Sequence, residues 1–184
     1  MAGRRAVFLD RDGVLNELVP RDGGPGSPWL PGEFRVAPGA ADAVRRLRER
    51  GWLVFVVTNQ PEVARGRIRP ADLEAMHAAL RAAVPVDDVA VCPHDDASGC
   101  ECRKPRPGLV RGLAARHGVD LARSFLVGDT WRDVGAGRAA GCRTIRLPPP
   151  PGGQARAGYE PDLAVSSLEE AVAAIEKELD GLRP

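Results

Sequence analysis

Short apolar runs alternate with amphipathic stretches along most of the chain. The runs are typical of buried strands, because a strand covered on both faces carries few polar residues. They lie at residues 6–9, 52–57, 89–91, 124–127, 142–147 and 163–165. Apolar positions recur at helical spacing between them, at residues 39–50, 70–83, 107–117, 131–140 and 168–182. This alternation predicts an α/β fold, a Rossmann-like three-layer sandwich with a mostly parallel central sheet.

Three segments interrupt this pattern. Residues 17–37 are rich in proline and glycine, and we expect an irregular loop that folds over the functional site. Residues 92–105 contain three cysteines and a histidine. Residues 148–153 are proline and glycine and cannot continue a strand or a helix, so we expect a linker or flap. The 184 residues are enough for one domain with a full core, and we expect residues 1–184 to form it.

Helix ends carry recognisable residues. Gly51, Gly118 and Gly141 each follow a predicted helix, and glycine readily adopts the left-handed conformation that ends one. Ser167 precedes the last helix, and Glu170 follows it three residues later. This spacing predicts a capping box at the start of that helix.

The charge balance excludes several classes of partner. The 26 basic and 25 acidic residues give a formal net charge of +1, which offers no general attraction to nucleic acid or to anionic membranes. The apolar run before Asp10 is too short for a signal peptide, and no run is long enough to span a bilayer. We therefore expect a cytoplasmic, monomeric protein with no nucleic-acid or membrane partner.

The first predicted strand stops at a carboxylate. Asp10 follows the apolar run directly, and Asp12 and Gly13 come just after it. Open α/β folds hold their chemistry at the carboxyl edge of the sheet, and glycine lets the chain turn sharply there. Asp10 can then act as a nucleophile or metal ligand, and Asp12 as a general acid and base. Taken alone, these residues fit a polar turn after a strand equally well.

Two other strands also end in polar residues. Thr58 follows the second strand, and its hydroxyl can donate a hydrogen bond to a phosphate oxygen. Asp129 follows the fourth strand, where it would meet Asp10 across the edge of the sheet. Two carboxylates and a backbone carbonyl would make an oxygen-rich site suited to Mg²⁺. Asp133, four residues later, fits either a functional role or a simple first-turn helix carboxylate.

Four metal-binding side chains lie within eleven residues: Cys92, His94, Cys100 and Cys102. Three thiolates and one imidazole complete a tetrahedral Zn²⁺ shell with no open position, which is typical of a structural site. We expect zinc to fold the loop that presents Arg103 and Lys104. These two cations suit an oxyanion and a transferring phosphoryl group, although such a pair alone also fits a solvated turn. Cys142 lies in a predicted strand and is expected in the core.

Together these segments resemble the haloacid-dehalogenase-type phosphatases. FLDRDGVLN is similar to the family's first motif, Asp-x-Asp-Gly, and three further segments match its other motifs in order over residues 6–147. CPH and CECRKP resemble a zinc-bearing subgroup, which includes phosphatases of heptose bisphosphates and of histidinol phosphate. The gaps after the first two motifs are too short for a cap domain, so the resemblance implies a capless member with a zinc-stapled loop.

The resemblance implies a role for each matching residue. The catalytic groups would be Asp10 as nucleophile, Asp12 as general acid and base, Thr58 and Lys104. Mg²⁺ would be bound by Asp10, Asp129 and the backbone carbonyl of Asp12, with Asp133 in support. The substrate would be contacted by Asn59, Gln60, Arg65 and Arg103. Pro61 and Thr130 depart from the serine and the basic residue that are more frequent in relatives, so each puts one substrate or solvent contact in doubt.

The activity implied is Mg²⁺-dependent hydrolysis of a small sugar phosphate through an aspartyl-phosphate. TNQ, ARG and CRKPRPG are most similar to the branch that removes the 7-phosphate of D-glycero-D-manno-heptose 1,7-bisphosphate, and histidinol phosphate is the alternative substrate. A phospho-acceptor signalling domain would share the acidic strand ends but has no need of Asp12. A zinc-stapled nucleic-acid binder is disfavoured by the near-neutral charge and by the 4% aromatic content.

Overall fold

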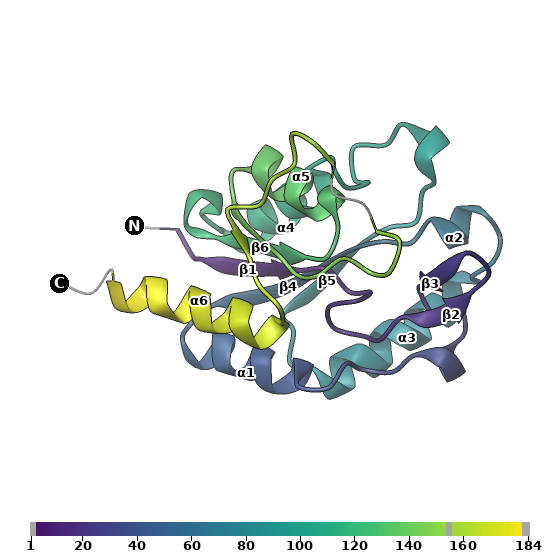
Figure 1. Cartoon of the computed structure of the whole chain (residues 1–184), viewed down its shortest axis with the longest axis horizontal. Coiled ribbons are helices and arrows are strands. Elements are labelled where there is room, and N and C mark those ends of the chain that lie inside the picture. Colours follow the sequence, from purple (N-terminus) through teal and green to yellow (C-terminus); the bar gives the residue numbers. More distant parts are fainter. Residues whose placement is uncertain (1–2, 154–155, 182–184) are drawn as a thin grey trace.

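The computed structural model describes residues 3–153 and 156–181, and its centre is a six-stranded sheet in the order β5-β4-β1-β6-β7-β8 (Figure 1). Every neighbouring pair in this sheet is parallel. The strands are β1 (Ala6–Leu9), β4 (Leu53–Asn59), β5 (Asp88–Cys92), β6 (Phe125–Gly128), β7 (Arg143–Arg146) and β8 (Leu163–Ala164). The predicted parallel sheet is therefore confirmed.

Helices cover both faces of the sheet, which makes three layers (Figure 1). They are α1 (Ala40–Glu49), α2 (Pro61–Ala64), α3 (Pro70–Ala83), α4 (Gly108–His117), α5 (Trp131–Ala140) and α6 (Leu168–Gly181). Alternate residues of β1 show how the core is divided. Val7 and Leu9 pack in a cluster with α1, α3 and α6, whereas Ala6 and Phe8 pack in a second cluster with α4 and α5. None of the described helices is long and apolar enough to cross a membrane.

The chain order reverses beside β1. β4 and β5 lie on one side of this strand, and β6 and β7 lie on the other. In open α/β sheets, a reversal of this kind opens a crevice at the carboxyl ends of the strands. The end of β1 is anchored there, because Asp10 N donates a hydrogen bond of 2.9 Å to Val127 O in β6. The acid that ends the first strand therefore stands at the switch point.

Two features near the end of β4 differ from the sequence prediction. β4 continues through Thr58 and Asn59, which pair with Val91 and Cys92 of β5. The apolar run ends at Val57, but backbone pairing with the neighbouring strand carries the extended conformation further. The short helix α2 then follows and was not predicted. Four residues are too few to carry a helical period, and the only local signal is Pro61 at the first position.

The expectation of an irregular loop over residues 17–37 is wrong for its first half. β2 (Val19–Arg21) and β3 (Gly24–Gly26) form an antiparallel hairpin, whose Pro25 and Gly26 line the same cleft as Pro61 of α2 (Figure 1). Gly23 and Gly24 adopt φ angles of +95° and +121°, and this left-handed conformation closes the turn between the strands. A 3₁₀ turn at Pro31–Glu33 follows. The first half of the segment therefore has regular secondary structure and is not an irregular loop.

The start of α6 carries the predicted cap. Glu170 N donates to Ser167 Oγ at 3.2 Å. The Glu170 carboxylate accepts from Ser166 N at 2.9 Å, one residue before the position that an ideal capping box uses. The helix is described to Gly181, and Leu182, the predicted end, lies outside the described residues.

Replacing Glu33 with glutamine should lower the free energy of unfolding by about 1 kcal/mol at pH 7. The Glu33 carboxylate accepts hydrogen bonds from Arg21 at 3.1 and 2.5 Å and from Trp29 N at 2.8 Å. Chiefly because of the bond from Arg21, the pKa of Glu33 falls from 4.5 to about 2 in the folded protein. The stabilisation is therefore complete above pH 4.5 and disappears as the pH falls toward 2.

Urea unfolding of both proteins between pH 2 and 7 measures this contribution. The difference between them should shrink as the pH falls from 4.5 toward 2, because the carboxyl of the unfolded wild type takes up a proton in this range while that of the folded protein is still ionised. A difference that persists unchanged at low pH would contradict the role given to Glu33.

Candidate active site

A cleft of about 360 Å³ opens at the carboxyl edge of the sheet. Its floor holds two of the predicted carboxylates, Asp10 and Asp129, together with Lys104. The hairpin contributes Pro25 and Gly26 to one wall. The full lining is Asp10, Asp12, Leu18, Pro25, Gly26, Ser27, Asn59, Pro61, Arg65, Asp96, Arg103, Lys104, Asp129, Thr130, Arg132 and Pro150. The predicted flap at residues 148–153 therefore borders the cleft through Pro150.

Asp10 is held from two sides. Its Oδ1 accepts from Arg11 N at 2.7 Å and lies 2.9 Å from Lys104 Nζ. Burial, followed by the nearby charge of Asp133, raises the pKa of Asp10 to about 7. A carboxylate fixed at a strand end beside a cation has the geometry of an anchored nucleophile.

The turn after β1 requires glycine at position 13. Gly13 has φ +79°, and a Cβ atom built there would lie 2.3 Å from Asp129 Oδ2. The absence of a side chain therefore lets the Asp129 carboxylate approach the backbone that follows Asp10. This explains the glycine of the Asp-x-Asp-Gly motif in terms of the site itself.

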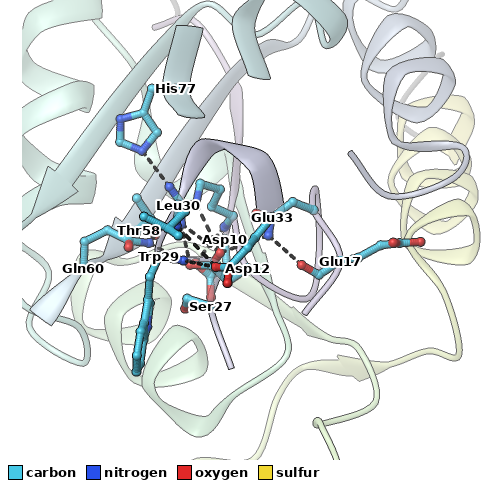
Figure 2. Close-up of polar contacts among 12 residues, drawn as sticks. Asp10, Asp12, Glu17, Ser27, Trp29, Leu30, Glu33, Thr58, Gln60 and His77 are labelled. Carbon is cyan, nitrogen blue, oxygen red and sulfur yellow. Dashed lines mark hydrogen bonds and ion pairs between the residues drawn. The ribbon is translucent and has the colours of Figure 1, made fainter. Parts of the chain in front are cut away.

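Asp12 is surrounded by hydrogen-bond donors. Arg11 Nη2 donates to its carboxylate at 2.9 Å, Asn16 Nδ2 at 3.1 Å and Gln60 Nε2 at 2.7 Å. Burial alone would raise the pKa of Asp12, but these donors, Arg11 above all, hold it below the usual value. Figure 2 shows the amide of Gln60 directed at Asp12. Asp12 is therefore ionised and tightly oriented in the free protein.

Arg11 and His77 are missing from the sequence prediction. The Arg11 side chain is fully buried, and its Nη1 lies 3.0 Å from the Nε2 atom of His77, the ring that Figure 2 labels. Burial and then the charge of Arg11 lower the pKa of His77 to about 4, so the ring is neutral. Since arginine can only donate, Nε2 is the acceptor. His77 thus supports the arginine that orients Asp12, and no local pattern in the sequence of α3 indicates this role.

Lys104 connects three elements. Its Nζ donates to Asp133 Oδ1 at 2.5 Å and to Val57 O at 2.8 Å, besides its contact with Asp10. Burial alone would lower the pKa of Lys104, but the charges of Asp10 and Asp133 outweigh it and raise the pKa. The amine is therefore a permanent cation beside Asp10.

Asp133 serves as the partner of Lys104 and as a helix cap. Its Oδ2 accepts from Thr130 N at 3.1 Å and from Thr130 Oγ1 at 2.6 Å, which closes a capping box at the start of α5. Both oxygens are thus occupied, and we expect Asp133 to orient the site, as predicted. A Cβ atom on Gly128 would lie 2.2 Å from Asp133 Cγ, so glycine is needed before Asp129.

The residues at the end of β4 lie in different environments. Thr58 is fully buried, and Gln60 is 1% exposed with its Nε2 bonded to Thr58 Oγ1 at 2.9 Å as well as to Asp12. Asn59 lines the cleft, but its side chain accepts from Lys104 N at 3.0 Å and donates to Lys104 O at 3.1 Å. We therefore expect Gln60 and Asn59 to position Asp12 and Lys104 rather than to grip the substrate.

The cysteine cluster comes together as the spacing predicted. Cys92 Sγ lies 3.6 Å from both His94 Nδ1 and Cys100 Sγ, and Cys102 Sγ lies 3.2 to 3.4 Å from the other three ligand atoms. A tetrahedral shell with Zn–S bonds near 2.3 Å separates neighbouring sulfurs by about 3.8 Å, so the four side chains fit Zn²⁺. None of the four cysteines forms a disulfide, and Cys142 is buried in the core, as expected.

A second group of ligand atoms lies at the floor of the cleft. Asp10, Asp129 and Asp133 each bring one carboxylate oxygen within 4.8 Å of the others. Burial, followed by the charge of Asp10, raises the pKa of Asp129 to about 8. Three buried carboxylates with one lysine between them lack positive charge, and a divalent cation would supply it. The donor set therefore fits Mg²⁺, with Asp10 and Asp129 as the ligands, since Asp133 is already occupied.

Comparisons with known proteins agree with this geometry. A family model described as HAD-hydrolase-like matches residues 101–171. A D-glycero-beta-D-manno-heptose-1,7-bisphosphate 7-phosphatase of Pseudomonas aeruginosa is 40% identical over 147 residues, which cover 77% of this chain and 80% of the relative. The chain belongs to the haloacid-dehalogenase-like phosphatases. It is therefore a phosphoric monoester hydrolase.

Two further members of this phosphatase family extend the likeness. A D-glycero-alpha-D-manno-heptose-1,7-bisphosphate 7-phosphatase of Mycobacterium tuberculosis is 35% identical over 180 residues, covering 92% of this chain and 90% of the relative. The crystal structure of a D,D-heptose 1,7-bisphosphate phosphatase from B. bronchiseptica, complexed with magnesium and phosphate, superposes with a TM-score of 0.81. That match has 34% identity and covers 95% of this chain and 99% of the other. The resemblance to the haloacid-dehalogenase family and the fold class are thereby confirmed.

Proposed function

We propose that this phosphatase removes the 7-phosphate of D-glycero-D-manno-heptose 1,7-bisphosphate through an aspartyl-phosphate on Asp10. One observation carries the proposal: a single cleft joins the acidic floor around Asp10 to a wall that contains Arg65, Arg103 and Arg132. The floor suits the phosphate that is transferred, and the arginines suit a second anion on the same molecule. The relatives that act on such a bisphosphate by name support the same substrate.

The residues divide the chemistry between them. The Asp10 carboxylate attacks phosphorus in line with the departing sugar oxygen, and Lys104 stabilises the phosphoryl oxygens beside it. The bound phosphoryl group places negative charge near Asp12, which raises the pKa of that carboxyl toward the range of a general acid. Asp12 takes up a proton from solvent as the substrate binds and gives it to the leaving oxygen. It afterwards takes a proton from the water that hydrolyses the aspartyl-phosphate. Arg11, Asn16 and Gln60 keep its carboxylate in place for both steps.

Magnesium is the proposed catalytic cation. Asp10, Asp129 and the backbone carbonyl of Asp12 would hold it. The raised pKa of Asp129 supports this assignment, because it reflects negative charge that a bound cation would balance. When bound, the ion supplies charge that stabilises the phosphoryl oxygens. The magnesium and phosphate in the B. bronchiseptica structure support this assignment.

Zinc is the proposed structural ion, held by Cys92, His94, Cys100 and Cys102. Arg103 and Lys104 follow the last of these ligands directly. A closed four-ligand shell would fix the backbone that presents both cations to the cleft. The monomeric state and the cytoplasmic location stay predictions.

Replacing Cys100 with serine should abolish stoichiometric zinc binding and lower kcat/KM at least about tenfold, because the loop that carries Lys104 loses its anchor. Zinc content by elemental analysis and phosphate release measure the two effects. Cys142→Ser is the matched control, since that thiol is not one of the four grouped metal-binding side chains and its replacement should leave zinc bound. Full activity in a zinc-free protein would contradict the structural role.

The bisphosphate is distinguished from histidinol phosphate by charge. Histidinol carries an amine and an imidazole, which three arginines would repel, whereas the heptose carries a second phosphate that they would bind. Phosphate release with Mg²⁺ should favour one heptose 1,7-bisphosphate anomer over histidinol phosphate at least about 100-fold in kcat/KM. Both anomers belong in the test, because relatives of both kinds match the chain. A preference for histidinol phosphate would overturn the substrate and leave the chemistry of Asp10 in place.

A further inference from the structure

Two guanidinium groups contact one carboxylate on the rim of the cleft, and a third, that of Arg132, lines the same cleft. Asp96 belongs to a 3₁₀ turn, Asp96–Ser98, within the cysteine-rich loop. Arg103 Nε donates to its Oδ1 at 2.9 Å and Nη2 to its Oδ2 at 3.2 Å, and Arg65 Nη2 lies 3.6 Å from Oδ2. Both carboxylate oxygens of Asp96 thus lie against guanidinium groups.

All four side chains line the same cleft as Asp10. The arginines come from different parts of the chain, after α2, after the cysteine cluster and in the first turn of α5. Arg132 stacks its guanidinium 4.7 Å from the ring centroid of Trp131, and among the described residues it has no hydrogen-bond or ion-pair partner. It therefore keeps unused donors beside the cleft. Charges brought together from three segments, with donors to spare, form a site for an oxyanion.

Asp96 is dispensable for the shape of its own turn. Asp95 caps that turn, because its Oδ1 accepts from Ala97 N at 3.1 Å, Ser98 N at 3.2 Å and Ser98 Oγ at 2.8 Å. The Asp96 side chain, by contrast, is 66% exposed, and its described contacts are with the arginines. The fold does not need this carboxylate for the shape of the turn. It nevertheless lies beside arginines in the cleft, where the anionic group of a ligand would bind.

We propose that Asp96 is a built-in anion that occupies the subsite for the non-transferred phosphate, and that Arg132 is a specificity-determining residue of that subsite. This inference rests on the proposed function. When the bisphosphate enters, its second phosphate replaces the Asp96 carboxylate on Arg65 and Arg103 and recruits the free donors of Arg132. A phosphate dianion offers more charge and more acceptor oxygens than a carboxylate, so the exchange is favourable. A molecule with one phosphate leaves Asp96 in place and does not gain this binding.

The test compares two ligands that differ only in the anomeric phosphate, heptose 1,7-bisphosphate and heptose 7-phosphate. The monophosphate is followed as a substrate or, where turnover is too slow, as a competitive inhibitor. Asp96→Asn should lower the KM of the bisphosphate about fivefold relative to that of the monophosphate, because the competing charge is gone. Arg132→Gln should raise the ratio of the bisphosphate KM to the monophosphate KM about tenfold, because one guanidinium group of the subsite is gone. Glu101→Gln is the matched control, since it removes one acidic charge from the same loop at a side chain that is 86% exposed and does not line the cleft.

Each other outcome has a definite meaning. A higher bisphosphate KM in Asp96→Asn would make Asp96 a partner that positions Arg103, and the proposal would fail. Equal changes for both ligands, or the same change in Glu101→Gln, would reduce the effect to general electrostatics and overturn it too. Wild-type turnover with an unchanged ratio in both variants refutes this inference alone. Absence of wild-type turnover on the bisphosphate refutes the proposed function and this inference with it. Equal zinc content and equal thermal unfolding of the variants show that all of them are folded.

Discussion

Asp10→Asn should lower phosphate release at least about 10⁴-fold while the protein stays folded and keeps its zinc. The amide cannot attack phosphorus, and nothing else at the end of β1 stands in its position. The fold should tolerate the change, because the substitution conserves the shape of the side chain. It also removes one of three mutually repelling buried carboxylates, Asp10, Asp129 and Asp133. In metal-free protein, the melting temperature of the variant should therefore be no lower than that of the wild type.

Phosphate release, circular dichroism melting and zinc analysis on the same preparation separate these effects. Asp42→Asn is a suitable control, because that exposed aspartate on α1 pairs with Arg45 far from the cleft. Its rate should stay within about twofold of the wild type. Turnover by Asp10→Asn at the wild-type rate would remove Asp10 from the mechanism, whereas loss of fold would make the rate uninformative about the nucleophile.

Lys104→Met should lower kcat about 10³-fold and destabilise the metal-free protein by about 3 to 5 kcal/mol. The lysine amine lies between Asp10 and Asp133 and also bonds to Val57 O. Methionine fills a similar volume, so the main loss is charge. Two buried carboxylates then face each other without their cation, and Val57 O loses its donor. Stability and rate should therefore fall together.

Urea unfolding in the presence of a chelator, together with phosphate release in saturating Mg²⁺, measures the two losses. Lys177→Met is the matched control, because that lysine is exposed on α6 and should change neither quantity measurably. A variant that lost activity without losing stability would show that Lys104 acts on the substrate but that its ion pairs with Asp10 and Asp133 do not stabilise the fold. A variant that lost neither would contradict the buried ion pairs.

Part of this protein could be predicted from local patterns. The runs 6–9, 70–83 and 131–140 coincide with β1, α3 and α5, because burial on a sheet or on one helix face imposes a period that a short stretch already displays. The cysteine cluster could be predicted for a similar reason, since its ligands lie close in sequence and their spacing limits where the side chains can go. The ends of parallel strands also had to meet at one edge, which placed Asp10 and Asp129 together.

Other features depended on the packing of distant segments. The hairpin at residues 19–26 was not predicted, because its strands are three residues each and have no apolar alternation. The contact between Arg11 and His77 joins the turn after β1 to α3, 66 positions away, and turns an inconspicuous helical histidine into support for Asp12. Asn59 likewise reaches Lys104 across 45 positions and stabilises its backbone.

The sequence by itself therefore determined the layers of the fold, the Asp-x-Asp-Gly turn after β1 and the grouping of three cysteines and a histidine, since each follows from short-range spacing. Only the tertiary structure decided which donors surround Asp12, how Lys104 is shared, and that Asp96 lies beside two arginines. Hydrogen bonds and charge act over a few ångströms in space, and residues that meet at such distances leave no periodic trace along the chain. The architecture of this phosphatase follows from its local patterns, and the electrostatics of its cleft follow from the way those elements pack.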